Sequence, residues 1–352
     1  MKNLRCGRET GFIGYRGYKM NLQNEHLWKD RKVIITGGLG FIGSNLARRL
    51  VDYGAQVTLV DSFVPEYGGN LYNIADIKDK VAVNISDVRD QFSFRHLVKD
   101  QDCLFNLAGQ TSHLDSMVDP HTDLDINCKA QLSILEACRL ENPGIKVVFA
   151  STRQIYGKPD YLPVDENHPI RPVDVNGINK VAGEQYHILY HKVYGIKTSV
   201  LRLTNTYGPR MRIKDARQTF LGIWIKKILS GESFEVWEGQ QLRDFTFVDD
   251  CVDALLQCAA NPAAEGRVFN LGGSEEPVSL ERLAEMLVAA NGGEGSFERK
   301  SFPAERKAID IGDYYSDTAL IQKTIGWKPR LGLQEGLEKS LEYFRTNLDK
   351  YL

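Results

Sequence analysis

The 352-residue chain is long enough for one large globular domain or two ordinary ones, and 42% of its residues are hydrophobic. Its formal net charge of −2 gives no support for binding to nucleic acid or to an anionic membrane. No apolar run approaches the ~18 residues that a membrane-spanning helix needs.

The first 30 residues are basic and rich in glycine. The stretch T-G-F-I-G at residues 10–14 resembles a phosphate-binding turn, but no apolar strand precedes it, so it lacks the context of a dinucleotide site. The segment also lacks the continuous apolar core of a secretory signal. We therefore predict that residues 1–30 form an N-terminal extension, either flexible or strapped to the surface.

A glycine-rich turn between a predicted strand, 33–36, and a predicted helix, 44–52, is the strongest signal in the sequence. The turn carries three glycines at a fixed spacing, Gly37, Gly40 and Gly43. In a dinucleotide site such glycines permit a tight turn, bring the backbone close to a pyrophosphate and let the helix pack against the strand. The helix N-terminus then offers free N–H groups to the phosphates.

An acidic residue at the end of the next predicted strand, 56–60, supports this interpretation. Asp61 follows the glycine turn by about 20 residues, where a carboxylate can bind the ribose hydroxyls of adenosine. Ser62 and Phe63 come next, and the absence of an arginine there favours NAD over NADP. The sequence therefore predicts NAD as the cofactor.

Strands and helices alternate as far as residue 203. Further strands are predicted at 81–83, 103–107, 146–150 and 198–203, and helices at 92–97, 124–140 and 179–193. This alternation predicts an α/β protein with a Rossmann-type doubly wound parallel sheet over residues 31–203.

Shorter elements follow residue 203. Helices are predicted at 220–230, 248–259, 280–290, 318–325 and 333–347, and strands at 234–237, 243–247 and 268–271. We interpret residues 204–352 as a smaller α/β substrate lobe, partly interleaved with the first, with a substrate cleft between the two. The six cysteines form no C-x-x-C pair, so we expect reduced thiols in a cytoplasmic protein and no metal site.

Seven stretches resemble one enzyme family when taken together and in order. They are T-G-G-L-G-F-I-G (36–43), N-L-A-G-Q (106–110), S-T-R-Q-I-Y-G (151–157), N-G-I-N-K-V-A-G-E (176–184), L-R-L-T-N-T-Y-G-P-R (201–210), R-D-F-T-F-V-D-D (243–250) and I-G-W-K-P (325–329). The chain from about residue 32 onward thus resembles the extended short-chain dehydrogenase/reductase family, which includes the nucleotide-sugar epimerases and dehydratases.

The resemblance implies the residues of two adjoining sites. The NAD site would comprise Gly37, Gly40, Phe41, Ile42, Gly43, Asp61, Asp87, Val88, Leu107, Ala108, Gly109 and Lys180. The nucleoside-diphosphate-sugar site would comprise Thr152, Asn205, Arg217, Phe220, Trp237 and Arg243, with Arg306 or Lys307 as a further phosphate contact. The family also implies a homodimer that pairs the helices predicted at 124–140 and 179–193.

Each matched position brings an expected role. Thr152 matches the residue that hydrogen-bonds the sugar hydroxyl being oxidised, and Lys180 matches the lysine that holds the nicotinamide ribose. Asn205 and Arg243 match residues that grip the diphosphate, for which a planar guanidinium is well suited. These diphosphate residues argue against a plain alcohol reductase with a small substrate.

One catalytic position departs from the family. The general base is normally a tyrosine four residues before the lysine, and this sequence has Asn176 there; Asn179 also replaces the usual serine. A phenol beside an ammonium group can accept a hydroxyl proton, whereas an amide cannot do so at neutral pH. The candidate catalytic positions are therefore Thr152, Lys180 and the altered Asn176.

Three hypotheses follow from this departure. The chain is an epimerase with a relocated base, for which the candidates are His113, Tyr161, Asp174 and Lys180. Alternatively it binds NAD and a sugar nucleotide without efficient catalysis, or it runs another reaction in which Arg153 and Gln154 take part. Dehydratases carry Asp-Glu at these last two positions, and decarboxylases usually keep the Glu, so both reactions are disfavoured. Epimerisation is the reaction we expect.

Overall fold

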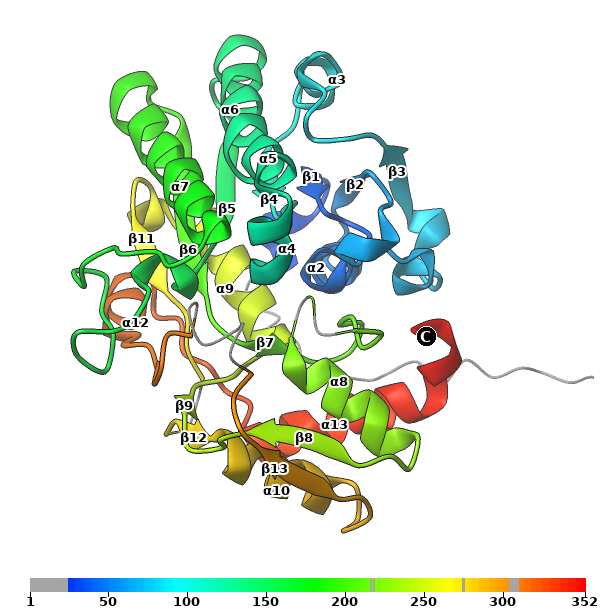
Figure 1. Ribbon diagram of the computed structural model, residues 1–352. Coiled ribbons are helices and arrows are strands. Elements are labelled where there is room, and N and C mark those ends of the chain that lie inside the picture. Colours follow the sequence, from blue (N-terminus) through cyan, green and yellow to red (C-terminus); the bar gives the residue numbers. More distant parts are fainter. Residues whose placement is uncertain (1–24, 216, 218, 274–275, 304–309) are drawn as a thin grey trace, which may run out of the picture.

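A seven-stranded parallel sheet forms the centre of the molecule (Figure 1). The computed structural model describes residues 25–215, 217, 219–273, 276–303 and 310–352. The strand order is β11-β6-β5-β4-β1-β2-β3, and every neighbouring pair is parallel. The strands are β1 (Lys32–Thr36), β2 (Gln56–Asp61), β3 (Val81–Ile85), β4 (Cys103–Asn106), β5 (Lys146–Thr152), β6 (Lys197–Leu203) and β11 (Val268–Asn270). This order confirms the predicted Rossmann-type fold.

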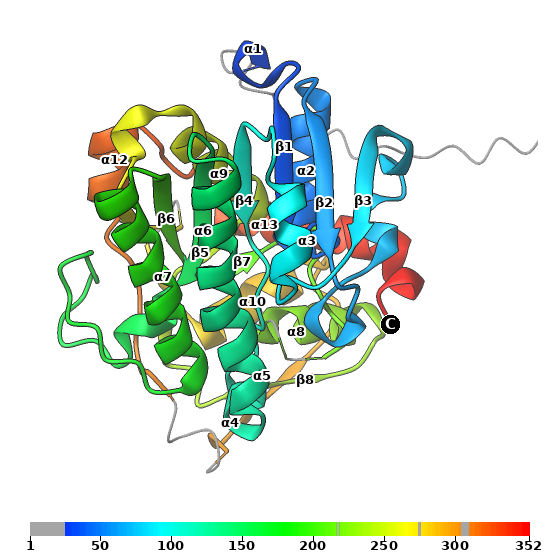
Figure 2. The same ribbon diagram turned by 90° about the horizontal axis from the view of Figure 1, so that it is seen from above.

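Helices cover both faces of the sheet (Figures 1 and 2). One face carries α3 (Gln91–Leu97), α6 (Ala130–Glu141) and α7 (Val175–Tyr194), and the other carries α2 (Phe41–Asp52), α9 (Val248–Ala260) and α12 (Ala319–Ile325). Side chains of β1 alternate between the two cores, Ile34 on the α6 side and its neighbours Val33 and Ile35 on the α2 side. Burial on both faces explains the continuous apolar run in this strand.

The second lobe lies beyond the carboxyl ends of the strands. It contains α8 (Phe220–Leu229), β8 (Phe234–Trp237), α10 (Leu280–Ala290), β13 (Phe297–Lys300) and α13 (Leu333–Asn347), and β8 pairs with β13. Two further short pairs form separate two-stranded sheets, β7 (Thr206–Tyr207) parallel with β10 (Thr246–Phe247) and β9 (Leu242–Arg243) antiparallel with β12 (Val278–Ser279). A separate apolar core around Trp224, Phe234 and Phe344 holds this lobe together.

The helix predicted at 124–140 begins earlier in the structure and contains a π-helical turn. The chain is helical without a break from α5 (Pro120–Leu124) through the π-helical η5 (Asp125–Lys129) to the end of α6, and the separate short helix α4 (His113–Val118) precedes it. The helix predicted at 179–193 begins at Val175 instead, because the carboxylate of Asp174 caps it by accepting a hydrogen bond from the Gly177 N–H, 2.6 Å.

The remaining helical turns are short. They are α1 (Glu25–Trp28), η2 (Pro65–Tyr67), η3 (Leu71–Ile74), η4 (Lys78–Lys80), η6 (Arg153–Tyr156), η7 (Pro262–Ala264) and η8 (Leu348–Lys350). Within the part of the chain that the structure describes, no helix is both long and apolar enough to cross a membrane.

The proposed domain boundaries stay predictions. Strand β11 lies within residues 204–352, yet it completes the main sheet, and α9 packs on the same sheet. Most of the predicted extension, residues 1–30, lies outside the described residues, as do Arg306 and Lys307.

Candidate active site

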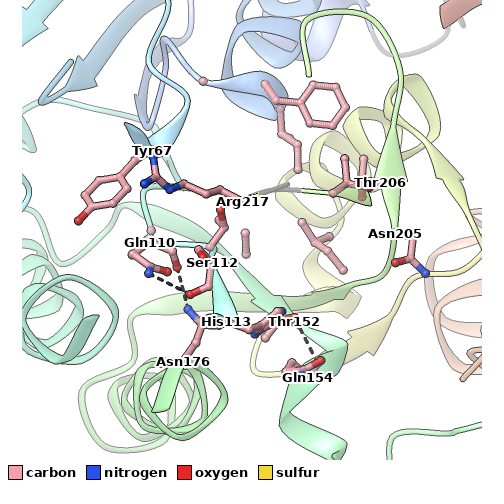
Figure 3. Close-up of a pocket in the computed structure, with 18 of the residues that line it drawn as sticks. Tyr67, Gln110, Ser112, His113, Thr152, Gln154, Asn176, Asn205, Thr206 and Arg217 are labelled. Carbon is pink, nitrogen blue, oxygen red and sulfur yellow. Dashed lines mark hydrogen bonds between the residues drawn. The ribbon is translucent and has the colours of Figure 1, made fainter. Parts of the chain in front are cut away.

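A cavity of about 620 Å³ lies between the carboxyl ends of the strands and the second lobe (Figure 3). All of the residues expected at the NAD site line it: Gly37, Gly40, Phe41, Ile42, Gly43, Asp61, Asp87, Val88, Leu107, Ala108, Gly109 and Lys180. The residues expected to bind the sugar nucleotide line it as well: Thr152, Asn205, Arg217, Phe220, Trp237 and Arg243. Asn176 also lies on its wall.

The glycine turn has the close backbone packing that a dinucleotide needs. Gly37 adopts a φ of 68°, and its N–H donates to the Val60 carbonyl at 2.8 Å. A Cβ on Gly43 would lie 2.2 Å from the Gly37 carbonyl oxygen, so no other residue fits there without movement. The N-cap of α2 is Gly40, which brings no side chain to the first N–H groups of the helix. The turn therefore fits a pyrophosphate.

The carboxylate of Asp61 is held by the backbone at the edge of the cavity. One oxygen accepts from the Leu39 N–H at 3.0 Å, and the other accepts from the Phe63 N–H at 2.9 Å. Burial raises the pKa of Asp61, and these two hydrogen bonds oppose the shift. The position suits a ribose hydroxyl donor. Further along the cavity, Asp87 is paired with Arg89 at 2.6 Å.

Thr152 and the ammonium group of Lys180 both lie near the end of β5. The Thr152 hydroxyl oxygen accepts from the Gln154 N–H at 3.2 Å, which leaves its own O–H available as a donor. Lys180 Nζ donates to the Ala150 carbonyl at 3.1 Å. Burial lowers the pKa of Lys180 to about 8, and the charge of Asp123 opposes this shift. Burial thus brings the pKa of Lys180 closer to neutrality than that of an ordinary lysine.

The amide of Asn176 belongs to a buried hydrogen-bond cluster. Its Nδ2 donates to the Gln110 carbonyl at 2.8 Å and to the carboxylate of Asp123 at 3.0 Å. Asp123 also accepts from Asn127 at 3.1 Å and from Asn179 at 2.8 Å. The two asparagines that depart from the family pattern, Asn176 and Asn179, thus bind the same buried carboxylate.

Two guanidinium groups lie at the opposite end of the cavity. Arg243 donates to the Leu242 carbonyl at 2.8 Å and to the Gly312 carbonyl, and burial lowers its pKa to about 10, with Arg153 adding to the shift. Arg153 donates to Asn205 Oδ1 at 3.3 Å. This end of the cavity therefore offers two cations to an anionic ligand.

The four alternative bases lie in different surroundings. His113 and Lys180 line the cavity, and Asp174 is buried against His113 with 3.0 Å between Nδ1 and Oδ2. Tyr161 is 45% exposed and donates to Asp165 at 2.7 Å, and it is not among the described residues that line the cavity.

Several lining residues were not predicted. Among them are Tyr67, Ser112, Thr204, Thr206 and Phe302. Thr204 directly follows β6 and Thr206 begins β7 two residues later, so the rule that ligands bind at strand ends could have found them. Phe302 contacts the Trp237 ring at a centroid distance of 5.8 Å, and no sequence pattern points to this pair.

Comparison with known proteins agrees with this geometry. A model of the NAD dependent epimerase/dehydratase family matches residues 33–272. A putative UDP-glucose 4-epimerase from Methanocaldococcus jannaschii is 34% identical, covering 90% of this chain and 99% of the relative.

Two solved structures are also similar. The UDP-glucose 4-epimerase from Thermotoga maritima, solved with UDP-glucose, has a TM-score of 0.82 and 28% identity, covering 90% of this chain and 99% of that one. The Thermus thermophilus UDP-glucose 4-epimerase, solved with NAD, has a TM-score of 0.78 and 28% identity. The match covers 89% of this chain and 99% of that one. These similarities confirm both the predicted resemblance and NAD as the expected cofactor. The chain belongs to the NAD dependent epimerase/dehydratase family.

Proposed function

We propose that this protein epimerises a nucleoside-diphosphate sugar, with NAD as a bound cofactor. The observation that carries the proposal is the single cavity in which the glycine turn and Asp61 lie at one end and Asn205, Arg153 and Arg243 at the other. This arrangement suits a dinucleotide facing a second diphosphate. The relatives named as UDP-glucose 4-epimerases favour a UDP-sugar and inversion at its C4 carbon.

The residues between the two ends would orient the reacting sugar. When bound, NAD would take a hydride from the sugar carbon and return it to the opposite face. Thr152 would donate a hydrogen bond to the sugar hydroxyl, and Lys180, whose Nζ lies close to Gly109, would bind the nicotinamide ribose. Arg243 would bind the diphosphate. It would keep the nucleotide anchored while the keto sugar rotates to present its other face.

Dehydration and decarboxylation are less well supported. The two positions after Thr152 hold Arg153 and Gln154, and neither can exchange protons as a pair of carboxyl groups can. Gln154 is instead buried, and its amide donates to Asp174 at 2.9 Å.

The competing function is a binding protein that keeps both sites but has lost turnover. It is motivated by Asn176, which cannot act as a base. A homodimer and a cytoplasmic location are further parts of our proposal, and both remain to be tested.

Incubation with sugar nucleotides separates the two functions. Purified protein saturated with NAD is mixed with a panel of UDP-, GDP-, CDP- and dTDP-sugars. An epimerase gives a second epimer and transient NADH absorbance with at least one of them. A binding protein takes up NAD and a sugar nucleotide, as measured by calorimetry, and gives neither signal.

The Asn176→Tyr variant provides the matched comparison. If the wild type is inactive and this variant gains turnover, the binding-protein hypothesis is supported and our proposal fails. If the wild type turns over and the variant is slower, the epimerase retains its own arrangement of catalytic groups.

A further inference from the structure

A histidine on the cavity wall, close to Asn176, is paired with a buried aspartate. His113 is the first residue of α4, and Asp174 is the N-cap of α7. The distance between His113 Nδ1 and Asp174 Oδ2 is 3.0 Å. Figure 3 shows His113 between Asn176 and Thr152 on the wall of the cavity. We propose that His113, oriented by Asp174, accepts the hydroxyl proton, an inference that rests on the proposed epimerase function.

Asp174 is a rigid partner for the imidazole. Its side chain is fully buried, and it accepts hydrogen bonds from the Gly177 N–H at 2.6 Å and from Gln154 Nε2 at 2.9 Å. Burial opposes ionisation, but the interactions with His113, Gly177 and Gln154 hold the pKa of Asp174 below its ordinary value. A fixed carboxylate of this kind selects one tautomer and one orientation of a histidine ring.

The pairing leaves one imidazole nitrogen for chemistry. With the proton on Nδ1 directed toward Asp174, the lone pair of the neutral ring lies on Nε2. The His113 side chain is 37% exposed and lines the cavity, so a ligand can reach it. The 3.0 Å contact between Nδ1 and Oδ2 is an ion-pair distance whose angle does not meet that of a hydrogen bond.

The same contacts connect the base with the residue expected to bind the sugar. Gln154 donates its backbone N–H to the Thr152 hydroxyl at 3.2 Å and its side-chain amide to Asp174. Thr152, Gln154, Asp174 and His113 therefore form one chain of contacts. A sugar hydroxyl bound by Thr152 would therefore lie near His113. The partner of His113, Asp174, is held by Gln154, which also binds Thr152.

Asn176 is compatible with this arrangement because its amide points elsewhere. Both of its hydrogen bonds run to the Gln110 carbonyl and to Asp123, within the buried cluster. Figure 3 shows Asn176 on the same side of the cavity as His113. The side chain of Asn176 binds Gln110 and Asp123 and therefore does not compete with His113 for Asp174.

The proposed step balances in both directions. In oxidation, the hydroxyl O–H bond breaks and its proton goes to His113 Nε2, while the carbon gives a hydride with its electron pair to NAD and a C=O bond forms. In the return step, the hydride comes back to the other face and the imidazolium returns its proton to the oxygen. Asp174 stays ionised throughout and stabilises the imidazolium.

Other ionisable groups surround α4 and bear on any pH dependence. The helix packs against α5 and α7, which contribute the buried Asp123 and Lys180. On α4 itself, Asp115 pairs with Arg217 at 3.0 Å. Variants at His113 must therefore be compared with the wild type under the same conditions.

The kinetic test uses His113→Ala in the full chain loaded with NAD. We expect the single-turnover rate of NAD reduction by the best sugar nucleotide to fall by about 10²–10⁴-fold. Affinities for NAD and for the sugar nucleotide stay near the wild-type values by calorimetry, and added imidazole restores part of the rate. The control is His121→Gln, an exposed histidine of α5 outside the cavity lining, which keeps the wild-type rate.

A second readout does not depend on activity. Nitrogen NMR of the histidine side chains, with His113→Gln for assignment, reports which ring nitrogen carries the proton. We expect the Nδ1–H tautomer in the wild type and its loss in Asp174→Asn, a variant that retains an N-cap residue. The Nε2–H tautomer in the wild type, or a full rate in His113→Ala, would overturn the proposal. A wild type with the expected tautomer but no turnover with any sugar nucleotide would instead defeat the epimerase function.

Discussion

One buried carboxylate near the cavity is matched by the amides of three asparagines. Asp123 is fully buried, and three asparagine amides donate to its carboxylate. An unpaired charge at this depth would be costly, and hydrogen bonds from neutral amides reduce the cost without adding a second charge. Asn176 and Asn179 therefore have a structural role at positions where the family pattern has a tyrosine and a serine: both stabilise the buried carboxylate of Asp123.

His187 is the residue for which the structure predicts a clear effect of pH on stability. It is fully buried, stacks on Phe149 at 4.2 Å and contacts the Gly183 carbonyl at 2.7 Å. Burial lowers the pKa of His187 to about 4; the Gly183 contact opposes the shift and the charge of Lys180 adds to it. Between pH 6.5 and 4 the unfolded chain therefore binds more protons at this residue than the folded chain does.

The contribution of the neutral, buried His187 to the free energy of unfolding is fully present above pH 6.5, and it is lost as the pH falls toward 4. The free energy of unfolding should drop by about 3 kcal/mol over this range on account of this residue alone. Urea denaturation across the range tests this, because His187→Gln should show a shallower drop than the wild type. The His121→Gln control should follow the wild-type curve, and equal slopes for all three chains would contradict the predicted shift.

Single residues at the site could be predicted where they follow a buried strand. Asp61, Thr152 and Asn205 lie at or just beyond the ends of β2, β5 and β6, and parallel strands bring those ends to one edge. The pairing of His113 with Asp174 could not be predicted, because it depends on how α4 packs against the start of α7. Taken singly, each of the two residues is only a candidate replacement for the missing tyrosine.

At the scale of elements, a buried ion pair connects α7 with the sheet. Glu184 of α7 accepts from Arg202 of β6 at 2.5 and 3.1 Å, and from the Ser151 hydroxyl of β5 at 3.0 Å. Arg202 also donates to the Tyr156 hydroxyl at 2.6 Å. Such a pair fixes the position of α7, which carries Lys180 and Asn176 into the cavity wall.

Replacing one member of the Glu184–Arg202 pair should lower the free energy of unfolding more than replacing both members does. We expect Glu184→Gln to lower the free energy of unfolding by about 3–5 kcal/mol, because it leaves Arg202 buried without a countercharge. The double variant Glu184→Gln/Arg202→Met should recover part of that loss. Urea denaturation of the double-mutant cycle measures the coupling, and Glu285→Gln, in the exposed pair with Arg282, serves as the control. Additive losses would show that the two side chains act independently.

Element boundaries followed from the sequence where a cap or a core pattern marks them. The predicted bounds of β8, α10 and α13 match the structure, and those of α9 differ by one residue. The π-helical turn at η5 could not be predicted, because residues 124–140 keep the apolar pattern of a regular α-helix. Strand β13 was also missed, since its sequence F-E-R-K is mostly exposed and carries only one large apolar residue.

At the scale of the whole molecule, the cavity exists because the chain returns to the first lobe after building the second. Strand β11 and helix α9 pack on the main sheet, and α13 returns to the second core. The chain therefore passes between the two lobes more than once, and residues of both lobes form the site. The alternating first half made the sheet predictable, whereas the mutual packing of the shorter later elements left no periodic signal to fix their arrangement.

The outer face of α6 and α7 gives the last prediction. These helices lie side by side on one face of the molecule (Figure 2). They expose an unusual set of large apolar side chains: Leu132, Leu140, Ile178, Leu189, Val193 and Tyr194. Because exposed apolar groups in this number favour burial against a partner, we predict a homodimer in which both helices pair with those of a second copy.

Single charged substitutions in this face should separate the subunits. Leu189, 49% exposed in the free chain, would be buried in the dimer, so Leu189→Glu should shift the sedimentation coefficient from that of a dimer to that of a monomer at micromolar concentration. Leu352→Glu changes an apolar side chain that is 55% exposed at the far end of the chain, and it should leave the dimer intact. Because the cavity lining comes from both lobes of one chain, the monomeric Leu189→Glu variant should still bind NAD. A wild type that sediments as a monomer would contradict the predicted pairing.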